Sequence, residues 1–112
     1  MSAVPSVNIT IEKGMDFEAT YIVTNSDGSV FPLTNQSATA KIKKHPTASS
    51  SKSFSTSIVS GIGEIRISMA STITSDLTSG RNYYDVIITN SSTGKKIKVF
   101  EGMALVRDTV SV

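Results

Sequence analysis

The side chains that could carry chemistry are few in this sequence and widely separated. The chain has no cysteine, which excludes a disulfide framework, a thiol nucleophile and a thiolate zinc site. His45 is the only histidine, and Pro46 and a serine-rich stretch follow it, so a base at this position is hard to hold in one orientation. We expect His45 to be a solvated loop residue and the protein to have no catalytic site.

The carboxylates do not form a ligand pattern either. Asp27, Asp76 and Asp85 are dispersed and lack the alternating spacing of a calcium loop. Glu18 and Glu64 have the spacing of outward residues on strands, where a solvated surface charge is the rule. We therefore expect no metal, no cofactor and no small-molecule substrate.

Lysines form the only basic clusters: Lys41, Lys43 and Lys44, and separately Lys95, Lys96 and Lys98. A net charge of +2 does not require an extended basic patch. No aromatic residue is interleaved with these lysines for stacking on bases. We expect the lysines to protect exposed sheet edges against aggregation, with a contact to phosphate or an acidic partner as the alternative, and we expect no nucleic-acid binding.

The composition favours a single β-rich domain over residues 1–112. Serine and threonine supply 32 of the 112 residues, and isoleucine and valine dominate the apolar set. Side chains branched at Cβ are stiff and pack well on a pleated sheet. No apolar stretch approaches the roughly 20 residues that a membrane span needs, so we expect no membrane contact.

Polar and apolar residues alternate along most of the chain, with turn residues between the alternating runs, as in sandwiches and barrels. The pattern predicts a tight hairpin at Asp27-Gly28, a short helical turn within Ala70–Gly80 and a bulge near Val99-Phe100. It predicts an all-β, antiparallel sandwich with the strand count of an immunoglobulin-like (Ig-like) domain. The seven expected strands are 7–11, 17–24, 36–44, 53–59, 64–69, 82–89 and 96–106.

The faces of these strands predict which side chains form the core. We expect Ile65 and Ile87 to face inward, with Ile73 and Leu77 four residues apart on the helical turn. One of the two adjacent tyrosines, Tyr83 and Tyr84, is expected to bond back to nearby backbone, as in the tyrosine corner of Greek-key sandwiches.

Contacts with other molecules are expected at loops and chain ends. The candidates are the two tails, the loop from His45 to Lys52 and the hairpin from Asn90 to Lys96, and an open sheet edge could also accept an added strand. The individual residues that we expect to make contacts are Phe31, His45, Lys52, Asn90, Lys95 and Lys96.

Turn and core motifs over most of the chain carry a resemblance to a known family. In the first half they are Lys13-Gly14-x-x-Phe17, Ser26-Asp27-Gly28-Ser29 with Pro32-Leu33-Thr34, and Ala38-Thr39-Ala40-Lys41-Ile42-Lys43-Lys44. In the second half they are Gly63-Glu64-Ile65-x-Ile67-Ser68, Thr72-x-Thr74-Ser75-x-Leu77-x-x-Gly80, Tyr83-Tyr84-Asp85-Val86 and Val99-x-Glu101-Gly102-x-x-x-Val106. The pattern resembles the small Ig-like domain of tailed-bacteriophage virion proteins, including the N-terminal domain of the upper baseplate protein family.

The resemblance implies a role in assembly. Such a domain anchors or decorates a particle without catalysis, so the expected partners are other virion proteins and the expected location is the virion, after synthesis in the host cytoplasm. An adaptor of the tail or baseplate is the leading expectation, with a capsid decoration (cement) protein as the alternative. A surface- or carbohydrate-adhesion module is the alternative from another class, and it needs exposed aromatics, for which Phe31 is the candidate.

Overall fold

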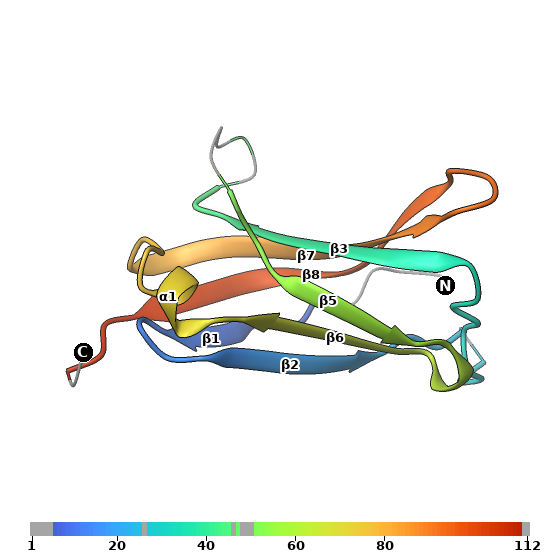
Figure 1. Cartoon of the computed structure of the whole chain (residues 1–112), viewed down its shortest axis with the longest axis horizontal. Coiled ribbons are helices and arrows are strands. Elements are labelled where there is room, and N and C mark those ends of the chain that lie inside the picture. The colour runs from blue at the N-terminus through green and yellow to red at the C-terminus, as the bar shows by residue number, and fades with distance from the viewer. Residues whose placement is uncertain (1–5, 26, 46, 48–50, 111–112) are drawn as a thin grey trace.

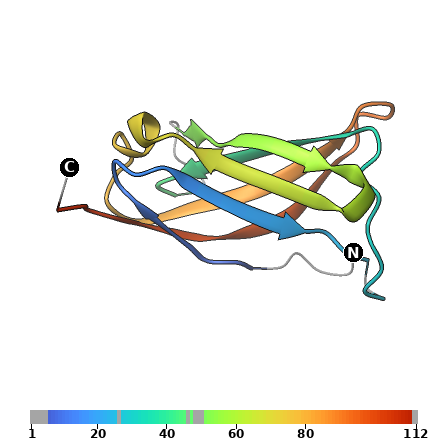
Figure 2. The same cartoon turned by 60° about the horizontal axis from the view of Figure 1, so that its bottom comes forward.

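The computed structural model describes residues 6–25, 27–45, 47 and 51–110. These residues form two β-sheets packed face to face (Figure 1; Figure 2). One sheet has five strands in the order β1-β8-β7-β3-β4, and the other has three strands in the order β2-β6-β5. The predicted all-β sandwich is therefore confirmed.

The elements have the following bounds. The five-stranded sheet contains β1 (Ile9–Glu12), β8 (Lys96–Arg107), β7 (Gly80–Asn90), β3 (Gln36–Lys43) and β4 (Lys52–Ser53). The three-stranded sheet contains β2 (Phe17–Ile22), β6 (Glu64–Met69) and β5 (Ser55–Val59). A 3-10 turn, η1 (Ser60–Ile62), joins β5 to β6, and a short helix, α1 (Ser71–Thr74), follows β6.

Two features differ from the predicted set of seven antiparallel strands. First, β1 pairs in parallel with β8, with Ile9 opposite Ala104. Second, the predicted strand 53–59 is divided into β4 and β5, because the Phe54 amide donates to the Ala40 carbonyl at 2.9 Å while Ser55 onward pairs with β6. The chain thus crosses from one sheet to the other at Phe54, whose side chain is buried between the sheets.

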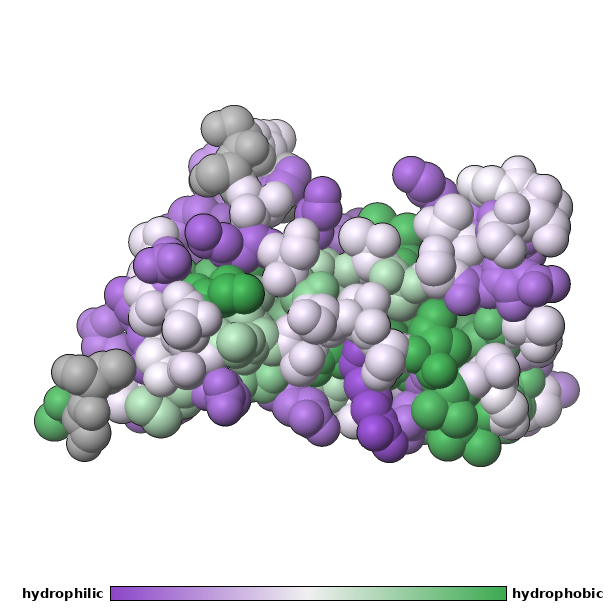
Figure 3. Space-filling view, in the orientation of Figure 1, coloured by the Kyte–Doolittle hydropathy of each residue, from purple (hydrophilic) through white to green (hydrophobic). Residues whose placement is uncertain are grey.

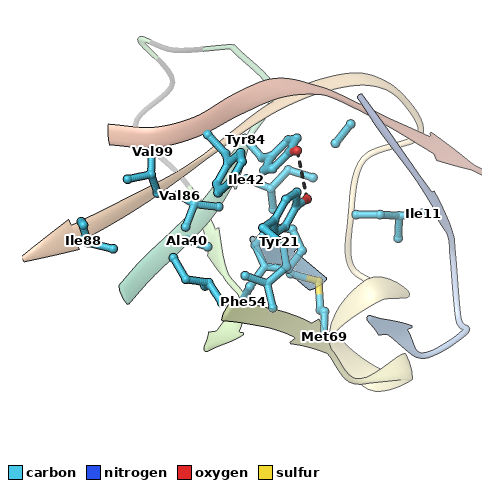
Figure 4. Close-up of a cluster of buried hydrophobic side chains, with 14 of the residues drawn as sticks. Ile11, Tyr21, Ala40, Ile42, Phe54, Met69, Tyr84, Val86, Ile88 and Val99 are labelled. Carbon is cyan, nitrogen blue, oxygen red and sulfur yellow. Dashed lines mark hydrogen bonds between the residues drawn. The ribbon is translucent and has the colours of Figure 1, made fainter. Parts of the chain in front are cut away.

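Alternation along β7 decides which of its side chains enter the core. Tyr84, Val86 and Ile88 are buried, whereas Tyr83 and Ile87 lie on the outer face of the sheet. The predicted burial of Ile65 is confirmed, but the prediction that Ile87 faces inward is wrong. Apolar residues follow one another without interruption in this part of β7. The sequence therefore shows no alternation that would tell which side chains face the core. Figure 4 shows buried side chains from both sheets pointing toward one another.

A pair of buried tyrosines joins the sheets to the start of the described chain. The Tyr84 hydroxyl donates to the Val7 carbonyl and accepts from the Tyr21 hydroxyl, 3.0 Å away (Figure 4). Burial raises the pKa of the Tyr84 phenol above its ordinary value, and the bond with Tyr21 raises this pKa further. The structural tyrosine is thus Tyr84, but its hydroxyl reaches Val7 and not the nearby backbone that we expected.

The turns agree with most of the local signals. Gly28 has φ +89° in the predicted hairpin, and β7 and β8 shift register next to Val99, where a bulge was expected. The predicted helical turn within Ala70–Gly80 is present as α1; Leu77 after it is buried, whereas Ile73 is exposed. Thr74 is buried, and its hydroxyl accepts from the Gly14 amide at 3.1 Å and donates to the Met15 carbonyl at 2.8 Å.

Candidate functional site

The predicted contact residues lie at two ends of the sandwich and not on one surface. Phe31 and the hairpin after β7 lie at one end, where the Ser91 amide donates to the Asn35 carbonyl at 2.8 Å. His45, on the segment that joins β3 to β4, and Lys52, the first residue of β4, lie toward the other end (Figure 1). The rest of that loop (residues 46 and 48–50) and the predicted tail contacts (1–5 and 111–112) lie outside the described residues.

Three of the predicted contact residues have local structural roles. Phe31 is only partly exposed, because its side chain packs against the core, so it is not the exposed loop aromatic that we expected. Lys52 is exposed at the start of β4, opposite Ile42. His45 is exposed, and its ring nitrogen Nδ1 lies 3.0 Å from the Thr47 hydroxyl.

Asn90 shapes the hairpin that carries Lys95 and Lys96. Its side-chain oxygen accepts from the Ser92 amide at 2.8 Å and from the Thr93 amide at 3.1 Å. This is the turn-forming role typical of asparagine. It occupies the side-chain oxygen of Asn90, which would otherwise be the acceptor for a partner molecule. Lys95 and Lys96 are exposed next to this turn.

Four exposed aliphatic residues gather at the same end of the molecule as this hairpin. We call this group the apolar end patch; each member is between 43% and 49% exposed, and the members are Ile22, Val30, Val59 and Ile62. They come from the end of β2, the strand-like segment after the Asp27-Gly28 turn, the end of β5 and η1. Figure 3 shows hydrophobic surface gathered at this end of the three-stranded sheet.

Sheet register brings the members of the patch together. Ile22 and Val59 flank Glu64 from the two neighbouring strands, so the three side chains form one row on the outer face. Val30 reaches the backbone at Gly63, directly after Ile62. The Glu64 side chain is only 12% exposed within this row, and its carboxylate accepts from Arg66 Nε at 2.8 Å. The patch therefore consists of aliphatic side chains around one carboxylate, Glu64, whose charge is paired with that of Arg66.

A second surface feature lies on the outer face of the five-stranded sheet. It is a groove of about 540 Å³, which we call the outer-face groove. Its floor is built from two rows of cross-strand neighbours, Lys43–Tyr83–Met103 and Lys41–Asp85–Glu101. Lys98, Ile87 and Asn8 also line it.

Charges and an aromatic ring meet in this groove. Lys98 Nζ lies 3.7 Å from Asp85 Oδ2 and 3.3 Å from Glu101 Oε1. Tyr83 is 39% exposed between Lys43 and Met103. Lys41 and Lys43 of the first sequence cluster and Lys98 of the second therefore line the outer face of the sheet, and one aromatic side chain, Tyr83, accompanies them.

Sequence reasoning missed both surfaces, because each depends on pairing between strands that are far apart in the chain. The adjacent pair Tyr83 and Tyr84 was the one local signal for the outer-face groove. Adjacent residues of a strand point to opposite faces, so one of the two rings had to lie on the outer face of the sheet. Within the described residues, no group of three or more His, Cys, Asp or Glu side chains could hold a metal ion. None of the described helices is long and apolar enough to cross a membrane.

Comparison with models of known protein families gives no match, and comparison with curated proteins gives none either.

Proposed function

We propose that the protein is a non-enzymatic structural subunit of a tailed-bacteriophage virion, an adaptor of the tail or baseplate that binds other virion proteins in multiple copies. The observation that carries this proposal is the apolar end patch. Clustered aliphatic side chains at the surface of a small domain mark a contact with another protein. The resemblance of the turn and core motifs to Ig-like virion domains supports the kind of assembly in which that contact is made.

The chemistry of the patch defines the partner surface that would fit. Ile22, Val59 and Ile62 present branched aliphatic side chains, and Glu64 between them is already paired with Arg66. A partner with an apolar surface can cover the patch without leaving an unpaired charge buried, which would be costly. A few fully desolvated residues near the centre of an interface contribute most of its binding energy.

A capsid decoration protein is the alternative placement in the same particle. The patch serves either role, since both need a protein contact and no catalysis. The two differ in the number of copies per particle, which is low at a tail tip and high over a capsid lattice. In either placement the protein is made in the host cytoplasm and ends in the virion.

Replacing Ile62 by glutamate tests directly whether the apolar end patch contacts another protein of the particle. Ile62 is exposed, so Ile62→Glu changes the free energy of unfolding by less than about 0.5 kcal/mol. In the assembled particle the new charge would be buried against an apolar partner, so the variant is incorporated at least about tenfold less than the wild type. The measurement is the amount of variant chain in purified particles, by mass spectrometry.

Ile73→Glu is the matched control. Ile73 is also an exposed isoleucine on a short helical element, but α1 lies at the opposite end of the sandwich (Figure 1). We expect Ile73→Glu to be incorporated like the wild type. Equal incorporation of Ile62→Glu and Ile73→Glu would show that the apolar end patch is not the docking surface.

A further inference from the structure

We infer that the outer-face groove binds a saccharide that carries an acidic group, with Tyr83 as the platform on which one sugar ring stacks. The groove volume of about 540 Å³ falls within the range of small-ligand sites, about 300–1,000 Å³. The inference goes beyond the proposed assembly role, and it concerns a different face of the molecule from the apolar end patch.

Tyr83 presents an exposed aromatic ring in the groove. Tyr83 sits on β7, in the middle of the five-stranded sheet, with Lys43 on one side and Met103 on the other. Its neighbour Tyr84 is buried and bonded, whereas Tyr83 leaves 39% of its surface in water. An aromatic ring offers an apolar face, and a sugar ring has an apolar C–H face beside its polar hydroxyl edge, so the two surfaces match.

Hydrogen-bond acceptors lie next to this ring. Asp85 follows Tyr83 on the same face of β7, and Glu101 is its direct neighbour on β8. Each ionised carboxylate can accept about four hydrogen bonds, and Lys98 takes only part of this capacity. Sugar hydroxyls are donors that could occupy the remaining positions.

The groove has an excess of positive charge, which favours an acidic ligand. Lys41 and Lys43 have no carboxylate partner among the described residues. With Lys98 they place three positive charges in the groove against the two carboxylates. A ligand with one negative charge balances this excess. A nucleic acid or an acidic peptide would bring several negative charges against Asp85 and Glu101, where like charges repel.

The test uses the whole chain on a glycan array. Biotinylated chain is displayed on streptavidin tetramers, because several linked sites bind more tightly than one. The array carries glycans ending in glucuronic, galacturonic or sialic acid, their neutral counterparts, and a single-stranded oligonucleotide. We expect binding to acidic glycans, at least about tenfold weaker for Tyr83→Ala and retained by Tyr83→Phe, which keeps the ring.

Two charge variants distinguish binding in the outer-face groove from a general electrostatic attraction of the protein to acidic glycans. Lys41→Gln removes a positive charge inside the groove and is expected to lower the preference for acidic over neutral glycans by about three- to tenfold. Lys95→Gln removes the same charge at the exposed hairpin and is expected to change nothing. Thermal melting of each variant confirms that it is folded.

Three results would overturn the inference: no acidic glycan bound, equal binding by Tyr83→Ala and the wild type, or an oligonucleotide bound more tightly than every saccharide. Because the array uses the isolated chain, a negative result here leaves the particle role standing. Absence of the chain from particles would in turn leave the groove result unchanged.

Discussion

Replacing Ile65 by alanine lowers the free energy of unfolding by about 2–5 kcal/mol. Ile65 lies on β6, the central strand of the three-stranded sheet, and is 0% exposed. The substitution removes buried aliphatic carbon atoms and leaves a cavity that close-packed neighbours on both sheets cannot fill. Urea unfolding followed by circular dichroism measures the change.

Ile87→Ala is the matched control, because it removes the same atoms from the outer face. Ile87 lines the groove and Ile88 is the buried neighbour. We expect Ile87→Ala to cost no more than about 1 kcal/mol and Ile88→Ala to match Ile65→Ala. If Ile87→Ala lowered the free energy of unfolding as much as Ile88→Ala, the assignment of Ile87 to the outer face of β7 would be wrong.

Replacing Gly102 by alanine has the second large effect. A Cβ atom at this position would clash with the Val7 carbonyl oxygen, so the backbone on one side must move. That movement breaks the bond from Tyr84 to Val7 and the bond from the Val7 amide to the Glu101 carbonyl. We expect a loss of at least about 2 kcal/mol, with faster hydrogen exchange at the Val7 amide.

Gly61→Ala provides the comparison for this variant. Nothing lies within 4 Å of a Cβ atom at Gly61, and its φ is not positive, so we expect a change within about 0.5 kcal/mol. A similar small change for Gly102→Ala would mean that the segment at Val7 is not held against β8.

Local patterns predicted the strands well where one face is apolar and the other polar. Residues 64–69 alternate cleanly, and β6 has the predicted bounds. Gly28 and Asn90 marked their turns because each has a backbone or side-chain property that the turn uses. These features depend on neighbouring residues only, which is why the sequence was sufficient for them.

Features that depend on distant pairing could not be predicted in the same way. The sheet change at Phe54 depends on Ala40, and the parallel pairing of Ile9 depends on Ala104. The two candidate surfaces have the same origin: the apolar end patch forms because β2 and β5 both flank Glu64, and the groove forms because β3 and β8 both flank β7. Register, which local periodicity does not specify between distant strands, decides both.

The central claim is that this chain is a subunit of an assembled particle, and its copy number in purified virions tests that claim most directly. Quantitative mass spectrometry against the major capsid protein of the proposed phage particle gives this number. We predict a few to a few dozen copies per particle, the stoichiometry of a tail or baseplate adaptor, whereas hundreds of copies would identify the capsid decoration alternative. Complete absence from purified particles would contradict the account.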